Sequence, residues 1–137
     1  MKKGRILHLE DDPQWVENVQ KLLGSSHDLY AAASPKEAAS LFMEMANENL
    51  KFDLAIIDIS LILHDAHDKK GFEFIEALEE SGVMEGHKII VLTGYPEVDQ
   101  NWRKAFRDFD VVDVFDKGTL IDNKAEFIKE VSEAIKN

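Results

Sequence analysis

Polar groups that could together transfer a phosphoryl group follow four short apolar runs of this chain. They are the acidic pair Glu10 and Asp11, the carboxylate Asp58, the hydroxyl Thr93 and the ammonium Lys117. An aspartate can act as a nucleophile toward phosphorus, while a metal ion, a hydroxyl and an ammonium can each neutralise one oxygen of the transferred group. Clustered carboxylates need a proton or a cation, and oxygen ligands without sulfur or paired histidines favour Mg²⁺ over zinc. The combination predicts a phosphorylatable Asp58 beside a magnesium site.

These groups can meet only if the right elements position them. Asp58 closes the apolar run 54–57, whose lack of alternation suits a strand buried on both faces. The chain alternates such runs with longer segments of helical period, which is typical of βα units around a parallel sheet. Because right-handed crossovers make all the strands point the same way, the residues that follow them gather at one edge.

Five rounds of this alternation are visible. We expect strands near residues 6–9, 29–32, 54–57, 88–92 and 111–115. We expect helices from Asp12–Pro13 to Gly24, from the capping box Ser34–Glu37, from Gly71 or Phe72 to Gly82, from Pro96, and from about Asp122. The last helix should carry one inward stripe made of Phe127, Ile128, Val131, Ala134 and Ile135.

Composition narrows the class of protein. A chain of 137 residues fits one domain over residues 1–137, and the absence of cysteine rules out disulfides and thiolate metal sites. The net charge of -11 disfavours direct contact with nucleic acid and favours a divalent cation or a basic protein partner. No signal peptide or membrane-spanning run is visible, so we expect a cytoplasmic protein without membrane contact.

The order of these motifs is similar to that of a known family. The runs 9–13, 53–58, 91–94 and 115–117 resemble the receiver domain of two-component response regulators, and the resemblance covers essentially the whole chain. Residues 71–75 also resemble the start of that family's third helix. The resemblance implies an α/β, doubly wound, flavodoxin-like fold whose five-stranded parallel sheet has the order 2-1-3-4-5.

The resemblance also implies a role for each site residue. Asp58 would be the phosphoacceptor, Thr93 the switch hydroxyl and Lys117 the phosphate-contacting lysine. The Mg²⁺ ligands would be Glu10, Asp11, Asp58 and the backbone carbonyl of Ser60. Glu10 and Asp11 are preferred to Asp12 because Asp12, followed by Pro13, already suits a helix cap.

The same resemblance implies the partners. The phosphoryl donor would be a phosphohistidine on a sensor histidine kinase or a phosphotransfer protein. Because the sequence ends with the last helix, we expect a signalling protein that docks onto a downstream protein target. It would not be an enzyme beyond its own phosphorylation and dephosphorylation, and homodimer formation is left open.

Two departures from the family pattern affect how phosphorylation would be read out. Gly118 follows Lys117 where the family usually has proline, so we expect the lysine backbone to be set differently or more loosely. Val114 stands where an aromatic is usual, and Phe115 should point to the opposite face. These changes keep an alternative open, a pseudo-receiver that binds proteins without phosphorylation.

Other motifs receive plainer interpretations. The segment between Asp58 and Gly71 is longer than usual and contains His64 and His67, which could bind metal or respond to pH, but an exposed polar loop is preferred. His8 is expected to be a core histidine bonded to a neighbour. Trp15 and Trp102 are expected to pack on helix faces.

Two other classes of protein share parts of the pattern. A haloacid dehalogenase-type phosphatase would need a second aspartate two residues after Asp58, where Ser60 stands. A flavodoxin-like flavin binder would need a phosphate loop rich in Ser, Thr and Gly after the first strand, where the acids stand instead. Both are therefore discounted.

Overall fold

A five-stranded parallel sheet forms the centre of the molecule. The computed structural model describes residues 3–59, 70–83, 88–94 and 111–136. The strands are β1 (Arg5–Leu9), β2 (Asp28–Ala32), β3 (Leu54–Ile57), β4 (Ile89–Thr93) and β5 (Val111–Asp116). All neighbouring pairs are parallel and the order is β2-β1-β3-β4-β5. The predicted fold class and strand order are confirmed.

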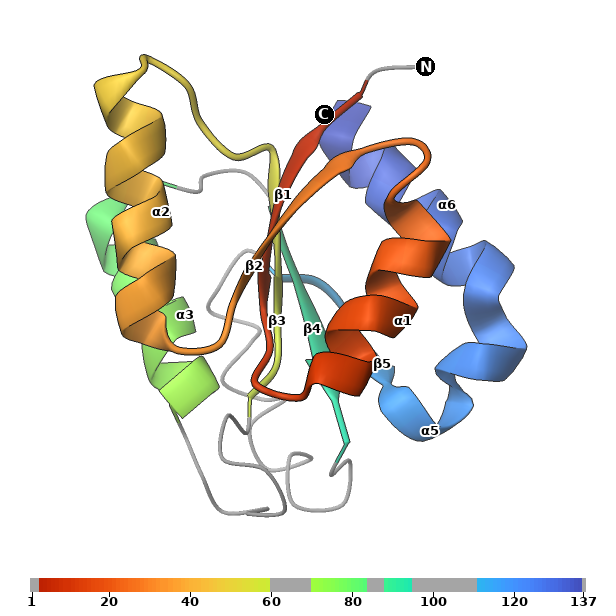
Figure 1. Cartoon of the computed structure of the whole chain (residues 1–137). Coiled ribbons are helices and arrows are strands. Elements are labelled where there is room, and N and C mark those ends of the chain that lie inside the picture. Colours follow the sequence, from red (N-terminus) through yellow and green to blue (C-terminus); the bar gives the residue numbers. More distant parts are fainter. Residues whose placement is uncertain (1–2, 60–69, 84–87, 95–110, 137) are drawn as a thin grey trace.

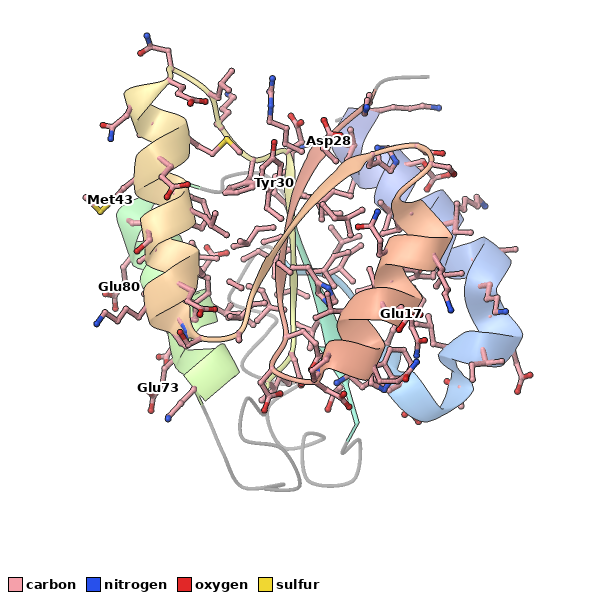
Figure 2. All side chains as sticks on the ribbon, in the orientation of Figure 1. Glu17, Asp28, Tyr30, Met43, Glu73 and Glu80 are labelled. Atoms are coloured by element: carbon pink, nitrogen blue, oxygen red, sulfur yellow. The ribbon has the colours of Figure 1, made fainter. Side chains whose placement is uncertain are left out.

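Helices cover both faces of this sheet. They are α1 (Pro13–Leu23), α2 (Pro35–Asn47), α3 (Lys70–Ser81), α5 (Lys117–Leu120) and α6 (Lys124–Lys136), with a 3₁₀ turn at Ile121–Asn123. In Figure 1, α2 and α3 lie on one side of the sheet and α1, α5 and α6 on the other. Figure 2 shows Met43 pointing outward from α2 and Tyr30 lying between that helix and the strands.

Each helical layer closes its own core against the sheet. The first cluster includes Leu7, Leu9, Ala55, Ile57 and Ile75, and the second includes Ile6, Ile56, Leu92, Phe127 and Val131. All residues of β3 and β4 are buried, as expected for central strands covered on both faces. Val114 packs against the first cluster and Phe115 against the second, so the predicted opposite orientation is confirmed.

Local capping explains where the helices begin and end. The Asp12 carboxylate accepts a hydrogen bond from the Gln14 N–H at 2.9 Å, just before α1. At the start of α2, Ser34 Oγ accepts from the Glu37 N–H at 3.2 Å. Glu37 bonds back to the N–H of Ala33 at 2.6 Å, one residue earlier than in the usual capping box. Gly82 has a φ of 71° just after α3, which is the left-handed C-terminal cap that glycine favours.

Two details differ from the sequence expectations, and a third detail concerns the pairing of the last two strands. Ile128 is 37% exposed, whereas Phe127, Val131, Ala134 and Ile135 of the same expected stripe are almost fully buried, so Ile128 lies at the edge of the buried face of α6. Residues 117–123 form a short helix and a 3₁₀ turn, so the last helix begins at Lys124 rather than near Asp122. A register shift at the start of the β4–β5 pairing precedes Asp113.

Several expectations fall on residues that the structure does not describe. They concern the fourth predicted metal ligand, the carbonyl of Ser60, the loop histidines His64 and His67, the helix expected from Pro96, and Trp102.

Candidate functional site

The residues predicted to act together lie at the carboxyl ends of the strands. Glu10 follows β1, Asp58 follows β3, Thr93 ends β4 and Lys117 follows β5. This is the lower edge of the sheet in Figure 1. The β-ladder fixes the first two, because the Glu10 N–H donates to Ala32 O at 2.9 Å and the Asp58 N–H donates to Leu9 O at 3.0 Å.

Side chains that are normally exposed are buried here. The relative exposure is 1% for Glu10, 4% for Asp58 and 9% for Lys117. Lys117 Nζ lies 2.7 Å from Glu10 Oε1 and donates a hydrogen bond to Asp58 Oδ2 at 3.0 Å. Two buried carboxylates therefore share one ammonium group. Thr93 is also fully buried, and the register pairs it with Asp116, directly before the lysine.

A third carboxylate completes an acidic cluster. Oxygen atoms of Glu10, Asp11 and Asp58 all lie within 4.8 Å of one another. This donor set fits a hard cation such as Mg²⁺, which takes oxygen ligands and usually only one or two carboxylates with several waters. These three predicted ligands are thus brought together, and the predicted fourth, the carbonyl of Ser60, lies outside the described residues.

Burial and neighbouring charges shift the pKa values of the acids and of the lysine in this cluster. Burial, reinforced by the charge of Asp58, raises the pKa of Glu10 to about 8. The same two causes raise the pKa of Asp11 above its usual value. Burial lowers the pKa of Lys117, but Asp58 and Glu10 outweigh that cost and the net shift is upward. Near neutral pH the site is therefore ready to exchange a proton for a metal cation.

The Trp15 ring packs against the ammonium group of Lys117. Trp15 was not assigned to the site from the sequence. Lys117 Nζ lies 5.4 Å from the centre of the Trp15 ring, within the range of a cation–π interaction. Trp15 belongs to the first turn of α1, which directly follows the acidic pair. The place of Trp15 in the first turn of α1 was the one feature of the sequence that could have assigned it to the site. A helix that begins directly after the acidic pair has its first turn next to these acids.

His8 lies in β1, two residues before Glu10, so the two side chains point to the same face of the sheet. It is 1% exposed, and neither of its ring nitrogens has a hydrogen-bond partner among the described residues. The expectation of a histidine bonded to a neighbour is therefore wrong. Burial, followed by the nearby charge of Lys117, lowers the pKa of His8 to about 3, so the ring is neutral at physiological pH.

Gly118 allows Lys117 to begin a helix. The Asp116 carboxylate accepts a hydrogen bond from the Gly118 N–H at 2.8 Å and caps α5. Proline, the usual residue at this position in the resembling family, has no N–H to donate. The backbone around Lys117 is thus set by a helix cap.

Gly71 allows α3 to approach Asp58 closely. A Cβ atom at Gly71 would overlap the backbone carbonyl oxygen of Asp58. The Gly71 N–H also donates to Ile59 O at 2.9 Å. The first turn of α3 therefore rests directly on the backbone that holds Asp58.

Solved structures show which fold this arrangement belongs to. No family model matches the sequence, and no curated protein matches it. A response regulator receiver domain protein from Clostridium thermocellum superposes with a TM-score of 0.72 at 19% identity, over 97% of this chain and 94% of that one. The BeF3-activated receiver domain of RstA from Klebsiella pneumoniae gives 0.72 at 22% identity, over 98% and 100%. The chain therefore has the receiver-domain fold over almost its whole length.

One further structure with this fold has a different description. It concerns streptococcal redox sensors that evolved from two-component response regulators, with a TM-score of 0.69 at 20% identity, over 97% of this chain and 51% of that one. Receiver folds thus occur in more than one signalling context. Among the described helices of this chain, none is long and apolar enough to cross a membrane.

Proposed function

We propose that this chain is a phosphoacceptor receiver domain of a two-component phosphorelay, with Asp58 as the phosphorylated residue. The observation that carries the proposal is the buried position of Asp58, between the ammonium group of Lys117 at 3.0 Å and the carboxylates of Glu10 and Asp11. A structural aspartate at a strand end would not need a buried lysine and two further acids around it.

The proposed reaction is a direct transfer between side chains. A carboxylate oxygen of Asp58 attacks the phosphorus of a phosphohistidine, the new O–P bond replaces the P–N bond, and the imidazole leaves with the bonding electron pair. Lys117 would hold an oxygen of the phosphoryl group by an ion pair, and the hydroxyl of Thr93 would donate to another. Mg²⁺ would be held by Glu10, Asp11, Asp58 and the Ser60 carbonyl, and would supply positive charge that neutralises the transferred group.

Phosphorylation would also disturb the contacts of the resting site. Lys117 now contacts both Asp58 and Glu10, so a phosphoryl group on Asp58 competes for the same ammonium. A change at Lys117 can reach α6, because Phe115 lies two residues earlier and packs edge-to-face on Phe127, with ring centres 5.1 Å apart. We infer that the Phe115–Phe127 contact takes over the role of the aromatic residue that the resembling family usually has in place of Val114.

The proposed partners follow from this reaction. A sensor histidine kinase or a phosphotransfer protein would donate the phosphoryl group, and a downstream protein would be bound in response. Residues 1–137 would act as a single cytoplasmic signalling domain that catalyses only its own phosphorylation and dephosphorylation.

A second candidate is a protein-binding module that works without phosphorylation. Val114 and Phe115 support it. Val114, at the position where the resembling family usually has an aromatic, packs on the α2–α3 side, and the aromatic Phe115 packs on the opposite side. The likeness to the streptococcal redox sensors supports it also, since that family is described as having evolved from response regulators.

One experiment separates the two candidates. The protein is incubated with acetyl phosphate and Mg²⁺, and its intact mass is measured with and without EDTA. We expect a gain of one phosphoryl group that requires Mg²⁺, is absent in Asp58→Asn and is retained in Asp53→Asn. No gain in the wild type, or an equal gain in Asp58→Asn, would rule out phosphorylation of Asp58 and favour the second candidate.

A further inference from the structure

A cavity of about 210 Å³ lies beside α1 and α5, outside the cluster of acids. Its apolar lining comes from Trp15, Leu22, Leu120 and Ile121, and its polar lining from Asn18, Lys21 and Lys124. We call it the α1–α5 cavity. Leu120 is almost fully buried, whereas the Ile121 side chain is 65% exposed although it is large and apolar. The cavity therefore has a buried apolar side chain, Leu120, in its wall and an exposed apolar side chain, Ile121, at its rim that a ligand could cover.

The volume of the cavity indicates which ring systems would fill it. An apolar cavity of roughly 150 Å³ accommodates benzene, and sites for drug-sized ligands begin near roughly 300 Å³. The α1–α5 cavity lies between these values, so it suits one or two fused rings. The Trp15 ring offers an aromatic surface for stacking or edge-to-face packing against such a ligand.

The charge around the cavity indicates the sign of the ligand. Lys21 and Lys124 both line it, in a chain whose net charge is -11. Lys21 also pairs with Glu17 at 3.0 Å, but both side chains are more than half exposed. Exposed pairs of this kind contribute little, so a ligand carboxylate can replace Glu17 at small cost.

We propose that the α1–α5 cavity binds a small aryl carboxylate. Its ring system packs against Trp15 and Leu120 and covers Ile121. Its carboxylate lies between the ammonium groups of Lys21 and Lys124. This pairing uses both features of the cavity, because an uncharged ring would leave the lysines unused and an inorganic anion would leave the apolar walls unused.

The cavity shares a wall with the candidate phosphoryl site. Trp15 lines the cavity and also lies beneath the ammonium group of Lys117, 5.4 Å from the ring centre. Leu120 closes the same four-residue helix that Lys117 begins. Binding is nevertheless a property of the unphosphorylated chain, so its test does not depend on whether Asp58 accepts a phosphoryl group.

The test is a titration of the full chain with 2-naphthoate, followed by calorimetry and by ¹H–¹⁵N NMR. We expect saturable binding with a Kd of about 1 mM or lower, as befits a ligand of this size. Shift changes should centre on α1 and residues 117–124 and include the Trp15 indole. Neutral 2-naphthamide should bind at least tenfold more weakly, and added salt should weaken naphthoate but not the amide.

Variants test the lysines directly. Lys21→Gln combined with Lys124→Gln should weaken naphthoate at least tenfold and leave the amide unchanged. Lys36→Gln, on the exposed surface of α2, is the matched control and should bind like the wild type. The proposal is overturned if naphthoate does not saturate, if the shifts centre elsewhere, if the amide binds equally well, or if Lys36→Gln weakens binding as much as the double variant.

Discussion

At the amino edge of the sheet two polar side chains, Asp53 and His27, bond to backbone groups, whereas at the carboxyl edge three carboxylates gather and two of them contact Lys117. Asp53 Oδ2 accepts a hydrogen bond from the Arg5 N–H at 2.9 Å, and His27 Nδ1 accepts from the Gly4 N–H at 3.0 Å. Both acceptors bond to backbone N–H groups at the start of β1, which would otherwise need water as a partner. The amino edge is therefore built for stability.

The carboxyl edge has the opposite character. Glu10 and Asp58 are buried and lie close to Asp11, and burial, followed by the charge of Asp58, raises the pKa of Glu10 to about 8. Such an arrangement costs stability and persists where the charges have a task. The difference shows that one regular sheet can keep stabilising contacts at one end and strained charges at the other.

The largest expected effect comes from adding a methyl group at each edge. At Gly71 the new Cβ would overlap the backbone carbonyl of Asp58, which cannot move without displacing the backbone of Asp58. At Gly4 it would meet three atoms of the Ile135 side chain at 2.7 to 3.1 Å, and a side chain can shift more easily than a backbone carbonyl. We expect Gly71→Ala to lower the free energy of unfolding by about 3 kcal/mol and Gly4→Ala by about 1 kcal/mol, measured by urea denaturation. Equal losses would show that the two edges are equally rigid.

A second expected effect concerns Mg²⁺ and protons at the carboxyl edge. Because burial and Asp58 raise the pKa of Glu10 to about 8, a cation must displace a proton at lower pH. We expect the apparent Mg²⁺ affinity, measured by calorimetry, to fall about tenfold per pH unit below pH 8, with one proton released. Glu10→Gln should flatten this dependence. A pH-independent affinity in the wild type would contradict the charge excess.

The two edges should also respond to pH with opposite signs when Mg²⁺ is absent. The folded-state pKa of Glu10 lies above its unfolded value of 4.5, so the folded protein binds more protons and gains stability as pH falls from 8. Burial lowers the pKa of His27, so its contribution is lost as pH falls below 6.5.

Two variants separate these contributions to the free energy of unfolding. Glu10→Gln should remove a slope of up to about 1.4 kcal/mol per pH unit between pH 8 and 6.5. His27→Gln should remove part of the loss below pH 6.5. Chemical denaturation across pH 5 to 8.5 in EDTA checks both, and a wild type that loses stability between pH 8 and 6.5 would contradict the first sign.

The sequence predicted the architecture and the meeting of the charged groups for a simple physical reason. The runs before Glu10, Asp58 and Thr93 are buried on both faces, so their composition alone marks them as parallel strands. Once the strands are parallel, their ends must share one edge. The roles of these residues in phosphoryl transfer remain predictions, as does the metal role of Ser60.

What the sequence could not predict depends on contacts between distant elements. Trp15 was expected to pack, but only the approach of α1 to α5 places its ring 5.4 Å from the ammonium group of Lys117. Nothing in the pattern around His8 shows that its nitrogens lack partners. Gly71 was read as a helix start, and its overlap with Asp58 follows from how closely α3 docks.

The most direct test of the contrast between the two edges compares Asp53 at the amino edge with Asp58 at the carboxyl edge. We expect Asp58→Asn, in EDTA at pH 8, to raise the free energy of unfolding by about 1 kcal/mol, because it removes repulsion among buried carboxylates. Asp53→Asn should lower it by about 1 kcal/mol, because it weakens a charge-assisted hydrogen bond to Arg5. Mg²⁺ should stabilise the wild type and Asp53→Asn more than Asp58→Asn. If Asp58→Asn is destabilised as much as Asp53→Asn and Mg²⁺ stabilises neither, the carboxyl edge holds no excess charge and no metal site.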